Sequence, residues 1–283
     1  MICIKDPIYI ILLIVCFACE NKDIQNDDTR LGSKVMIIGH MGMGVYYSWP
    51  GNSLESLRTT LDIGCDGTEM DVQITADSIL VAYHDGDLSS QTNCDGKIHE
   101  MTWDQISNCR YDQNINSSKL IRLEDLFSSI QNIENYYFSL DCKVDAPMAD
   151  PVPYKLRFLR AIQRICIKYN IEKNVFIEGP KNFLMLTKQM NLKNPLFLLT
   201  IHEDSPADTA LSHNLFGISI PYQQGVELFE HSSLLHIRTM VWAPSNYYQN
   251  KSALEKKPDI IQTDDPISLL KLTNRFNYES VRP

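Results

Sequence analysis

Short apolar runs alternate with segments of helical hydrophobic spacing along most of this 283-residue chain. Residues 52–63, for example, place Leu54, Leu57 and Leu61 on one helical face, with Gly64 as a stop signal. The apolar runs predict nine strands, at 35–39, 68–74, 79–83, 136–143, 175–178, 196–201, 216–220, 239–242 and 260–263. Alternation of strands with helices predicts βα units and a mostly parallel sheet in one large domain, a size typical of α/β barrels.

One of the nine strands is surplus to an eight-stranded barrel. Only about four residues separate 68–74 from 79–83, too few for a parallel crossover, so these two runs should form an antiparallel hairpin. With Ala76 and Asp77 as the turn, Glu69 would lie opposite His84, and alternation would place Asp71 on the same face. The polar stretch that follows, about 86–120, reads as an insertion.

The first residues resemble an export signal and not a part of the fold. The apolar run Ile8–Ala18 is about half the ~20 residues needed to span a bilayer. It ends at Cys19, and a small residue before such a Cys resembles the lipobox of bacterial lipoproteins. We therefore expect residues 1–18 to be a lipoprotein signal peptide, Cys19 to carry the lipid, and polar residues 19–33 to form a flexible tether. The alternative is an ordinary cleaved signal with a chance Cys.

These features predict an exported, membrane-anchored lipoprotein of the cell envelope, with its globular domain at 34–283. The net charge of −9, without an evident basic cluster, argues against a nucleic-acid partner. Five cysteines remain after the presumed lipid site, an odd number with no C-x-x-C pair, which argues against a zinc site. Cys94 and Cys109 could pair in an oxidising compartment, or both remain free thiols.

Polar residues stand at the ends of several predicted strands, where a parallel barrel builds its active site. Three carboxylates among them suit a hard divalent cation. Two histidines flanking that cation could exchange protons with a phosphorus centre, and a lysine could hold phosphoryl oxygens. The candidates are His40 and His84 as catalytic residues, Glu69, Asp71 and Asp141 as metal ligands, and Lys143 as a phosphate contact.

The order of these blocks resembles the glycerophosphodiester phosphodiesterase family. The family pattern Gly-x-Asp-x-x-Glu-x-Asp-Val-x-x-Thr-x-Asp matches residues 64–77, with His84 and Asp85 at the expected distance. The resemblance implies a (β/α)8 TIM-type barrel with a small insertion after the second-strand hairpin. It also implies hydrolysis of a small glycerophosphodiester to glycerol 3-phosphate and an alcohol. A late Trp of the family corresponds to Trp242, an expected substrate contact, and the final motif corresponds to residues 260–266.

Two departures from the family pattern keep other functions open. Met41 stands where the family has Arg, which removes a bidentate phosphate donor, and Gly51 stands where it has Glu. One alternative is a lipid phosphodiesterase of the phospholipase C or D kind. The other is a non-catalytic binding lipoprotein built on the same barrel.

Overall fold

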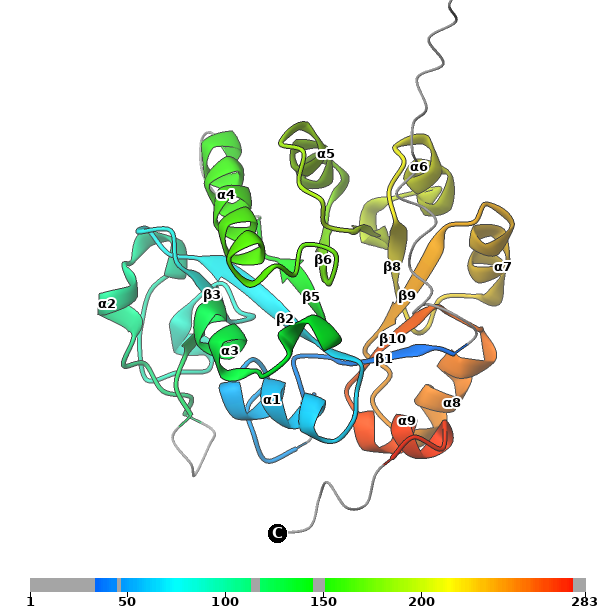
Figure 1. Cartoon of the computed structure of the whole chain (residues 1–283), viewed down its shortest axis with the longest axis horizontal. Coiled ribbons are helices and arrows are strands. Elements are labelled where there is room, and N and C mark those ends of the chain that lie inside the picture. The colour runs from blue at the N-terminus through cyan, green and yellow to red at the C-terminus, as the bar shows by residue number, and fades with distance from the viewer. Residues whose placement is uncertain (1–33, 45–46, 113–117, 145–150, 277–283) are drawn as a thin grey trace, which may run out of the picture. The chain divides into compact units, whose positions relative to one another are not determined.

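A closed parallel barrel forms the centre of the computed structural model, which describes residues 34–44, 47–112, 118–144 and 151–276 (Figure 1). Its eight strands are β1 (Met36–Gly39), β2 (Gly67–Ile74), β5 (Tyr137–Cys142), β6 (Val175–Gly179), β7 (Leu196–Leu199), β8 (Gly217–Pro221), β9 (Arg238–Trp242) and β10 (Ile260–Thr263). Neighbouring strands pair in parallel, and β1 closes the ring by pairing with both β10 and β2. The predicted (β/α)8 barrel is therefore confirmed.

Helices cover the outside of this barrel (Figure 1). They are α1 (Leu54–Asp62), α3 (Leu123–Ser129), α4 (Pro151–Tyr169), α5 (Lys181–Gln189), α6 (Pro206–Ser212), α7 (Val226–Leu234), α8 (Tyr247–Glu255) and α9 (Pro266–Leu272). Local chemistry sets their starts: the Ser53 side chain caps α1 by accepting from the amide of Ser56, and Asp265 caps α9 just before Pro266. Short 3-10 turns lie at Ile133–Asn135 and Thr200–His202.

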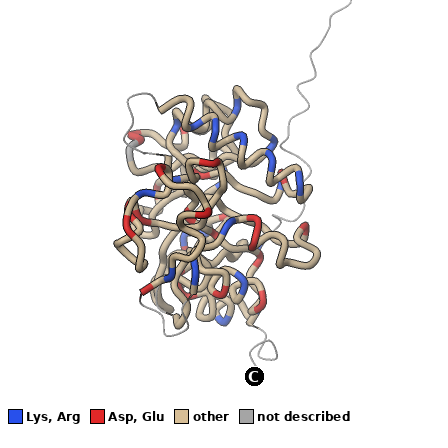
Figure 2. The backbone as a smooth tube through the Cα atoms, turned by 90° about the vertical axis from the view of Figure 1, so that its left-hand side faces the viewer, with Lys and Arg blue, Asp and Glu red and all other residues tan. Residues whose placement is uncertain are grey.

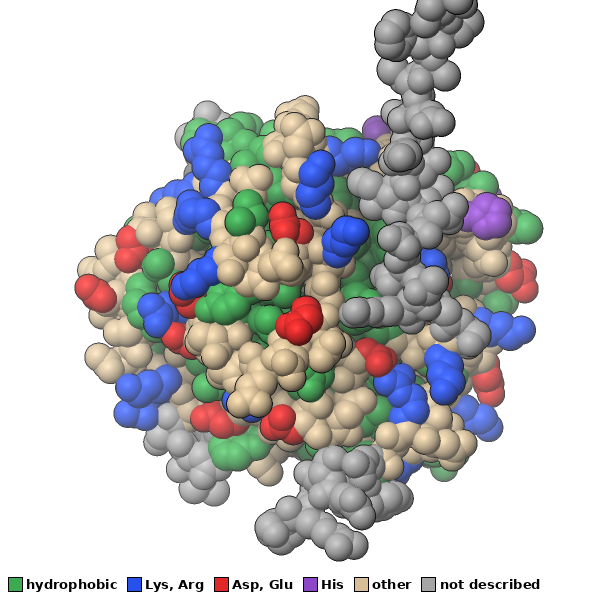
Figure 3. Space-filling model, viewed as in Figure 1, with side chains coloured by type: hydrophobic (Ala, Val, Ile, Leu, Met, Phe, Trp, Pro, Cys, Tyr) green, Lys and Arg blue, Asp and Glu red, His purple; other side chains and the backbone are tan. Residues whose placement is uncertain are grey.

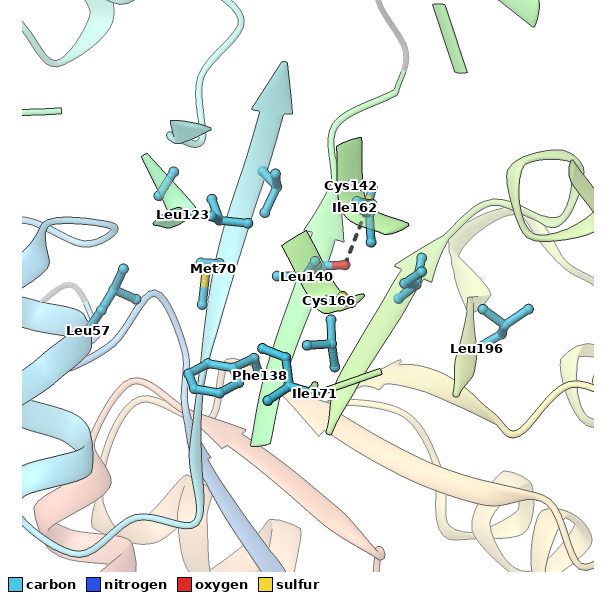
Figure 4. Packing of buried hydrophobic residues seen from close by; sticks show 14 of the residues in the cluster. Leu57, Met70, Leu123, Phe138, Leu140, Cys142, Ile162, Cys166, Ile171 and Leu196 are labelled. Carbon is cyan, nitrogen blue, oxygen red and sulfur yellow. Dashed lines mark hydrogen bonds between the residues drawn. The ribbon is translucent and has the colours of Figure 1, made fainter. Parts of the chain in front are cut away.

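The main core lies between the outer faces of the strands and the inner faces of the helices. Met70 of β2, Leu140 of β5, and Ile162 and Cys166 of α4 pack in one buried layer (Figure 4). Each of these four side chains is fully excluded from solvent. Such burial, at about 25 cal/mol per Å² of apolar surface, holds the helices on the barrel and so keeps the strand ends in place.

The β2–β3 hairpin forms as expected, but its predicted register is wrong by one residue. β3 (Leu80–Ala82) is antiparallel to β2, and Ala82 lies opposite Val72 instead of Asp71. The cause is a three-residue turn: the amide of Thr75 donates to the carbonyl of Ile79, and Ser78 adopts a positive φ of 70°. Consequently Glu69 is not paired with His84, which lies beyond the end of β3.

The segment after this hairpin forms a small satellite with its own core. It contains 3-10 turns at Leu88–Ser90 and Ile98–Glu100, helix α2 (Trp103–Ile106) and strand β4 (Ile121–Arg122), which pairs with β3. A cluster that includes Tyr83 and Tyr111 fills it. A disulfide joins Cys94 to Cys109, which decides between the two alternatives that the sequence left open, while Cys65, Cys142 and Cys166 are free and buried.

The predicted signal peptide, Cys19 and the tether lie outside the described residues. Within the described ranges, no helix combines the length and apolarity that crossing a membrane requires.

Candidate active site

The candidate residues gather at the carboxyl ends of β1, β2 and β5, where barrel enzymes place their catalytic groups. His40 directly follows β1, and its amide donates to the carbonyl of Thr263 in β10 (2.9 Å). Asp71 in β2 and Asp141 in β5 are paired in register across neighbouring parallel strands. Lys143 follows β5 immediately. Strand pairing therefore brings together groups that lie up to about a hundred residues apart in sequence.

His40 is held by a carboxylate that the sequence analysis did not select. Its Nδ1 lies 2.8 Å from Oδ1 of Asp264, and its Nε2 lies 3.9 Å from Oε2 of Glu69. Burial alone would lower the pKa of His40, but the bond to Asp264 and the charge of Glu69 outweigh it and raise the pKa to about 9. Asp264 thus fixes both the orientation and the charge of this imidazole. The only sequence signal for it was its place in the family's final motif.

Glu69 is almost completely buried, with 1% of its surface exposed. Its Oε2 accepts a hydrogen bond from the amide of Met41 (2.7 Å), whereas its Oε1 has no hydrogen-bond partner among the described residues. Burial and the negative charge of Asp71 raise the pKa of Glu69 well above its usual value. An unpaired buried carboxylate oxygen is costly unless a cation or donor satisfies it.

Lys143 lies between the other two candidate carboxylates. Its Nζ is 2.8 Å from Oδ1 of Asp71 and 2.7 Å from Oδ2 of Asp141. Burial opposes ionisation of Asp71, but the ammonium group of Lys143 outweighs it, and the pKa of Asp71 falls below its usual value. Asn52 holds Asp71 from the other side, since its side chain donates to Oδ2 (2.8 Å) and accepts from the Asp71 amide (3.0 Å). Asn52 is a further site residue that the residue-by-residue analysis missed.

His84 reaches the same region from the loop after β3. It is about half exposed, and its Nδ1 lies 2.6 Å from Oδ1 of Asp85. It is close enough to Asp71 for its positive charge to lower the pKa of that carboxyl group. The structure therefore brings His84 to the carboxylates despite the wrong register, because a loop residue is not bound by strand alternation.

Trp242 ends β9, also at the carboxyl edge of the barrel. Its indole Nε1 is buried and has no hydrogen-bond partner among the described residues. A buried indole donor normally finds a hydrogen-bond partner, and the substrate contact expected of Trp242 stays a prediction.

Met41, which replaces the family's Arg, contributes its backbone and an apolar side chain. It adopts a positive φ of 50°, the conformation in which its amide meets Glu69. A Cβ added at Gly51 would lie 2.8 Å from the Met41 methyl carbon. The two departures from the family pattern are therefore neighbours in space, and the Met41 side chain covers the space above Gly51.

The three candidate metal ligands do not converge in the way the sequence analysis expected. Across the described residues, no three His, Cys, Asp or Glu side chains group closely enough to hold an ion. In the structure Lys143 bridges Asp71 and Asp141, and Glu69 accepts a hydrogen bond from the amide of Met41 through one of its oxygens. The donor set nevertheless fits a hard cation, since it offers carboxylate oxygens only, one of them buried and unpaired.

A further acidic side chain, Glu178, lies beside this cluster, because β6 pairs it in register with Asp141 of β5. Glu178 of β6 is 2% exposed and accepts three hydrogen bonds, from Ser139 (2.6 Å), Ser219 (2.5 Å) and Gln262 (2.5 Å). Burial and the charge of Asp141 raise the pKa of Glu178. Its isolated position in an apolar run gave no sign of this network.

Comparison with known proteins agrees with this geometry. Residues 40–268 match the model of the glycerophosphoryl diester phosphodiesterase family. A glycerophosphodiester phosphodiesterase of Caldanaerobacter subterraneus is 24% identical over 250 residues, covering 86% of this chain and 99% of the relative.

Two solved structures share the fold. One is a glycerophosphodiester phosphodiesterase from Parabacteroides distasonis, with a TM-score of 0.72 and 20% identity over 85% of this chain and 97% of that one. The other is an Oleispira antarctica phosphodiesterase in complex with the product sn-glycerol-3-phosphate, with a TM-score of 0.73 and 16% identity over 84% of this chain and 96% of that one. The family match spans most of the chain and includes both histidines, all three carboxylates and Asp264. The chain therefore belongs to the glycerophosphoryl diester phosphodiesterase family, a family of phosphoric diester hydrolases.

Proposed function

We propose that this protein hydrolyses small glycerophosphodiesters to glycerol 3-phosphate and an alcohol. The observation that carries the proposal is His40, which Asp264 orients within 3.9 Å of the partly unpaired Glu69 carboxylate at the barrel mouth. A relative's structure with bound sn-glycerol-3-phosphate supports this class of product.

In this proposal the two histidines move the protons. His40, held as an imidazolium by Asp264, is suited to donate a proton to the leaving oxygen. His84 is more exposed and paired with Asp85, and it accepts a proton from the water whose oxygen bonds to phosphorus as the bond to the leaving oxygen breaks. Lys143 supplies a positive charge to the phosphoryl oxygens.

Glu69, Asp71 and Asp141 would hold one divalent cation, Mg²⁺ or Ca²⁺. Such an ion would neutralise charge that develops on the phosphoryl oxygens.

The test is release of glycerol 3-phosphate from glycerophosphocholine or glycerophosphoethanolamine with Mg²⁺ or Ca²⁺. We expect His40→Ala and His84→Ala each to lower kcat by roughly 10²–10⁴-fold and a chelator to abolish turnover. His231→Ala is the matched control, because His231 lies on α7, away from the strand-end cluster, and its imidazole pairs with Asp208. Unchanged release by His40→Ala would refute the proposal. With a diacyl phospholipid supplied as a parallel substrate, release of diacylglycerol or of a cyclic phosphate would assign the lipid phosphodiesterase function instead.

We further propose that the protein is exported and anchored to a membrane of the cell envelope through acylated Cys19. The lipobox-like sequence supports this proposal, as does the disulfide between Cys94 and Cys109, because disulfides persist mainly in oxidising compartments. Expression with a labelled fatty acid tests it: the label should enter the native chain but not Cys19→Ser. Equal labelling of both chains would contradict the assignment.

A further inference from the structure

The acidic net charge of this protein conceals a strongly basic region. Residues 151–193 contain nine Lys and Arg and only two Asp and Glu, a formal charge of +7. Because the whole chain carries −9, the remaining residues carry −16. The earlier interpretation that the chain has no basic cluster was therefore wrong.

This basic region coincides with α4, β6 and α5 and the loops beside them. Lys and Arg side chains gather over α4 and α5 in Figure 3, and many Lys and Arg positions also lie in the upper part of Figure 2. The cations are therefore collected on one side of the barrel wall.

Helix α4 has two different faces along its 19 residues. One face is buried against the barrel through residues such as Phe158, Ile162 and Cys166. The other face exposes Val152, Arg160, Arg164 and Ile167. At about 100° per residue these four positions fall within one third of the helix circumference, so they form a continuous outer stripe.

Most of the cations on α4, including both arginines of this stripe, form no ion pair with an acidic side chain among the described residues. Five Lys and Arg lie on α4, and no Asp or Glu does. Arg157 and Arg164 donate to the backbone carbonyls of Ala76 and Ser78. No ion pair to either residue or to Arg160 occurs within the described part of the chain, whereas Lys168 pairs with Glu124.

The stripe also carries exposed aliphatic side chains. Val152 is 45% exposed and Ile167 is 57% exposed, one near each end of the helix. Cations combined with aliphatic residues on a convex helix face suit contact with a flat, anionic and partly apolar surface. A convex face does not enclose a small ligand.

We propose that the outer stripe of α4, defined as Val152, Arg160, Arg164 and Ile167, docks on an anionic phospholipid membrane. Charge complementarity carries the proposal, since the stripe is positive in an otherwise strongly negative protein. The contact is independent of lipid attachment at Cys19 and would orient the barrel on the membrane, as a second signal beside an anchor.

Binding to vesicles tests this proposal with the chain Ser33–Pro283, which forms a compact unit by itself and lacks the proposed anchor. Sedimentation should show binding to vesicles of phosphatidylcholine mixed with phosphatidylglycerol, little binding to phosphatidylcholine alone, and weaker binding as salt rises. Arg160→Gln with Arg164→Gln should lower partitioning roughly 25-fold, at roughly fivefold for each cation removed near such a surface. Turnover of glycerophosphocholine should stay unchanged, because neither arginine belongs to the catalytic site.

The matched control is Lys251→Gln with Lys257→Gln. It makes the same change in net charge at two exposed positions on and after α8, and it should bind vesicles within about twofold of the native chain. An equal loss in both double variants would reduce the effect to net charge and overturn the proposal. The proposal would also be overturned if the native chain did not bind the mixed vesicles, or if it bound a single-stranded DNA oligonucleotide instead of them.

Discussion

Replacing Asp264 by Asn tests whether one carboxylate controls the charge of His40. The two side chains meet at 2.8 Å, and only about a tenth of the Asp264 side chain is exposed. A hydrogen bond between charged groups contributes roughly 1.5–3 kcal/mol, which corresponds to about one to two pKa units. In Asp264→Asn we therefore expect the His40 pKa to fall from about 9 by that amount.

Proton NMR titration of the chelator-treated protein would measure this pKa directly. The same change should appear in stability. The pKa of His40 in the folded protein lies above the ordinary value of 6.5. Protonated His40 therefore stabilises the folded state fully below pH 6.5, and this stabilisation is lost as the pH rises through about 9. Its upper limit is roughly 3 kcal/mol, so urea unfolding should separate native and variant proteins at about pH 6 and much less above pH 9.

Asp265→Asn is the control for this experiment. It makes the same charge change one residue away, where Asp265 bonds Tyr47 (2.7 Å) and caps α9, so it should leave the His40 pKa nearly unchanged. Asp264→Asn should also reduce kcat by roughly 10- to 100-fold, because a poorly oriented imidazole transfers protons less efficiently. An unaltered His40 pKa in Asp264→Asn would refute this reasoning.

Three further changes probe the rest of the site and its support. Lys143→Met leaves the buried Asp71 carboxylate and the partly exposed Asp141 carboxylate without their cation, so chelated protein should lose up to roughly 3–5 kcal/mol of unfolding free energy. Mg²⁺ or Ca²⁺ should restore part of this loss in calorimetry, and no cation-dependent recovery would contradict the assigned ligands. Glu178→Leu leaves three donors unpaired and should lower the free energy of unfolding in urea by roughly 3 kcal/mol or more. Glu178→Gln retains hydrogen-bond partners and should lower it by less than about 1 kcal/mol. Equal losses in the two variants would show that the network does not stabilise the barrel. The Cys94–Cys109 disulfide joins residues 15 positions apart in sequence. Replacing both cysteines by Ser should cost roughly 3 kcal/mol of stability in thermal unfolding of the insertion but preserve turnover at low temperature. A loss of turnover at low temperature would show that the insertion shapes the active site.

Hydrophobic spacing alone determined much of the fold. The apolar runs located all eight barrel strands and the hairpin, because each strand has to bury side chains whatever its neighbours are. Ordered motifs also identified His40, Glu69, Asp71 and Asp141 as candidates. These features are local, so they can be read from short stretches of chain.

Tertiary structure decided the contacts between distant segments. Asp264 meets His40 across 224 residues, and Glu178 meets Gln262 across 84, so no local pattern could reveal either pair. The hairpin register depended on one extra turn residue, Ser78, because a single-residue slip reverses every facing side chain. The basic stripe of α4 likewise emerged only when burial separated the outer face of the helix from the inner one.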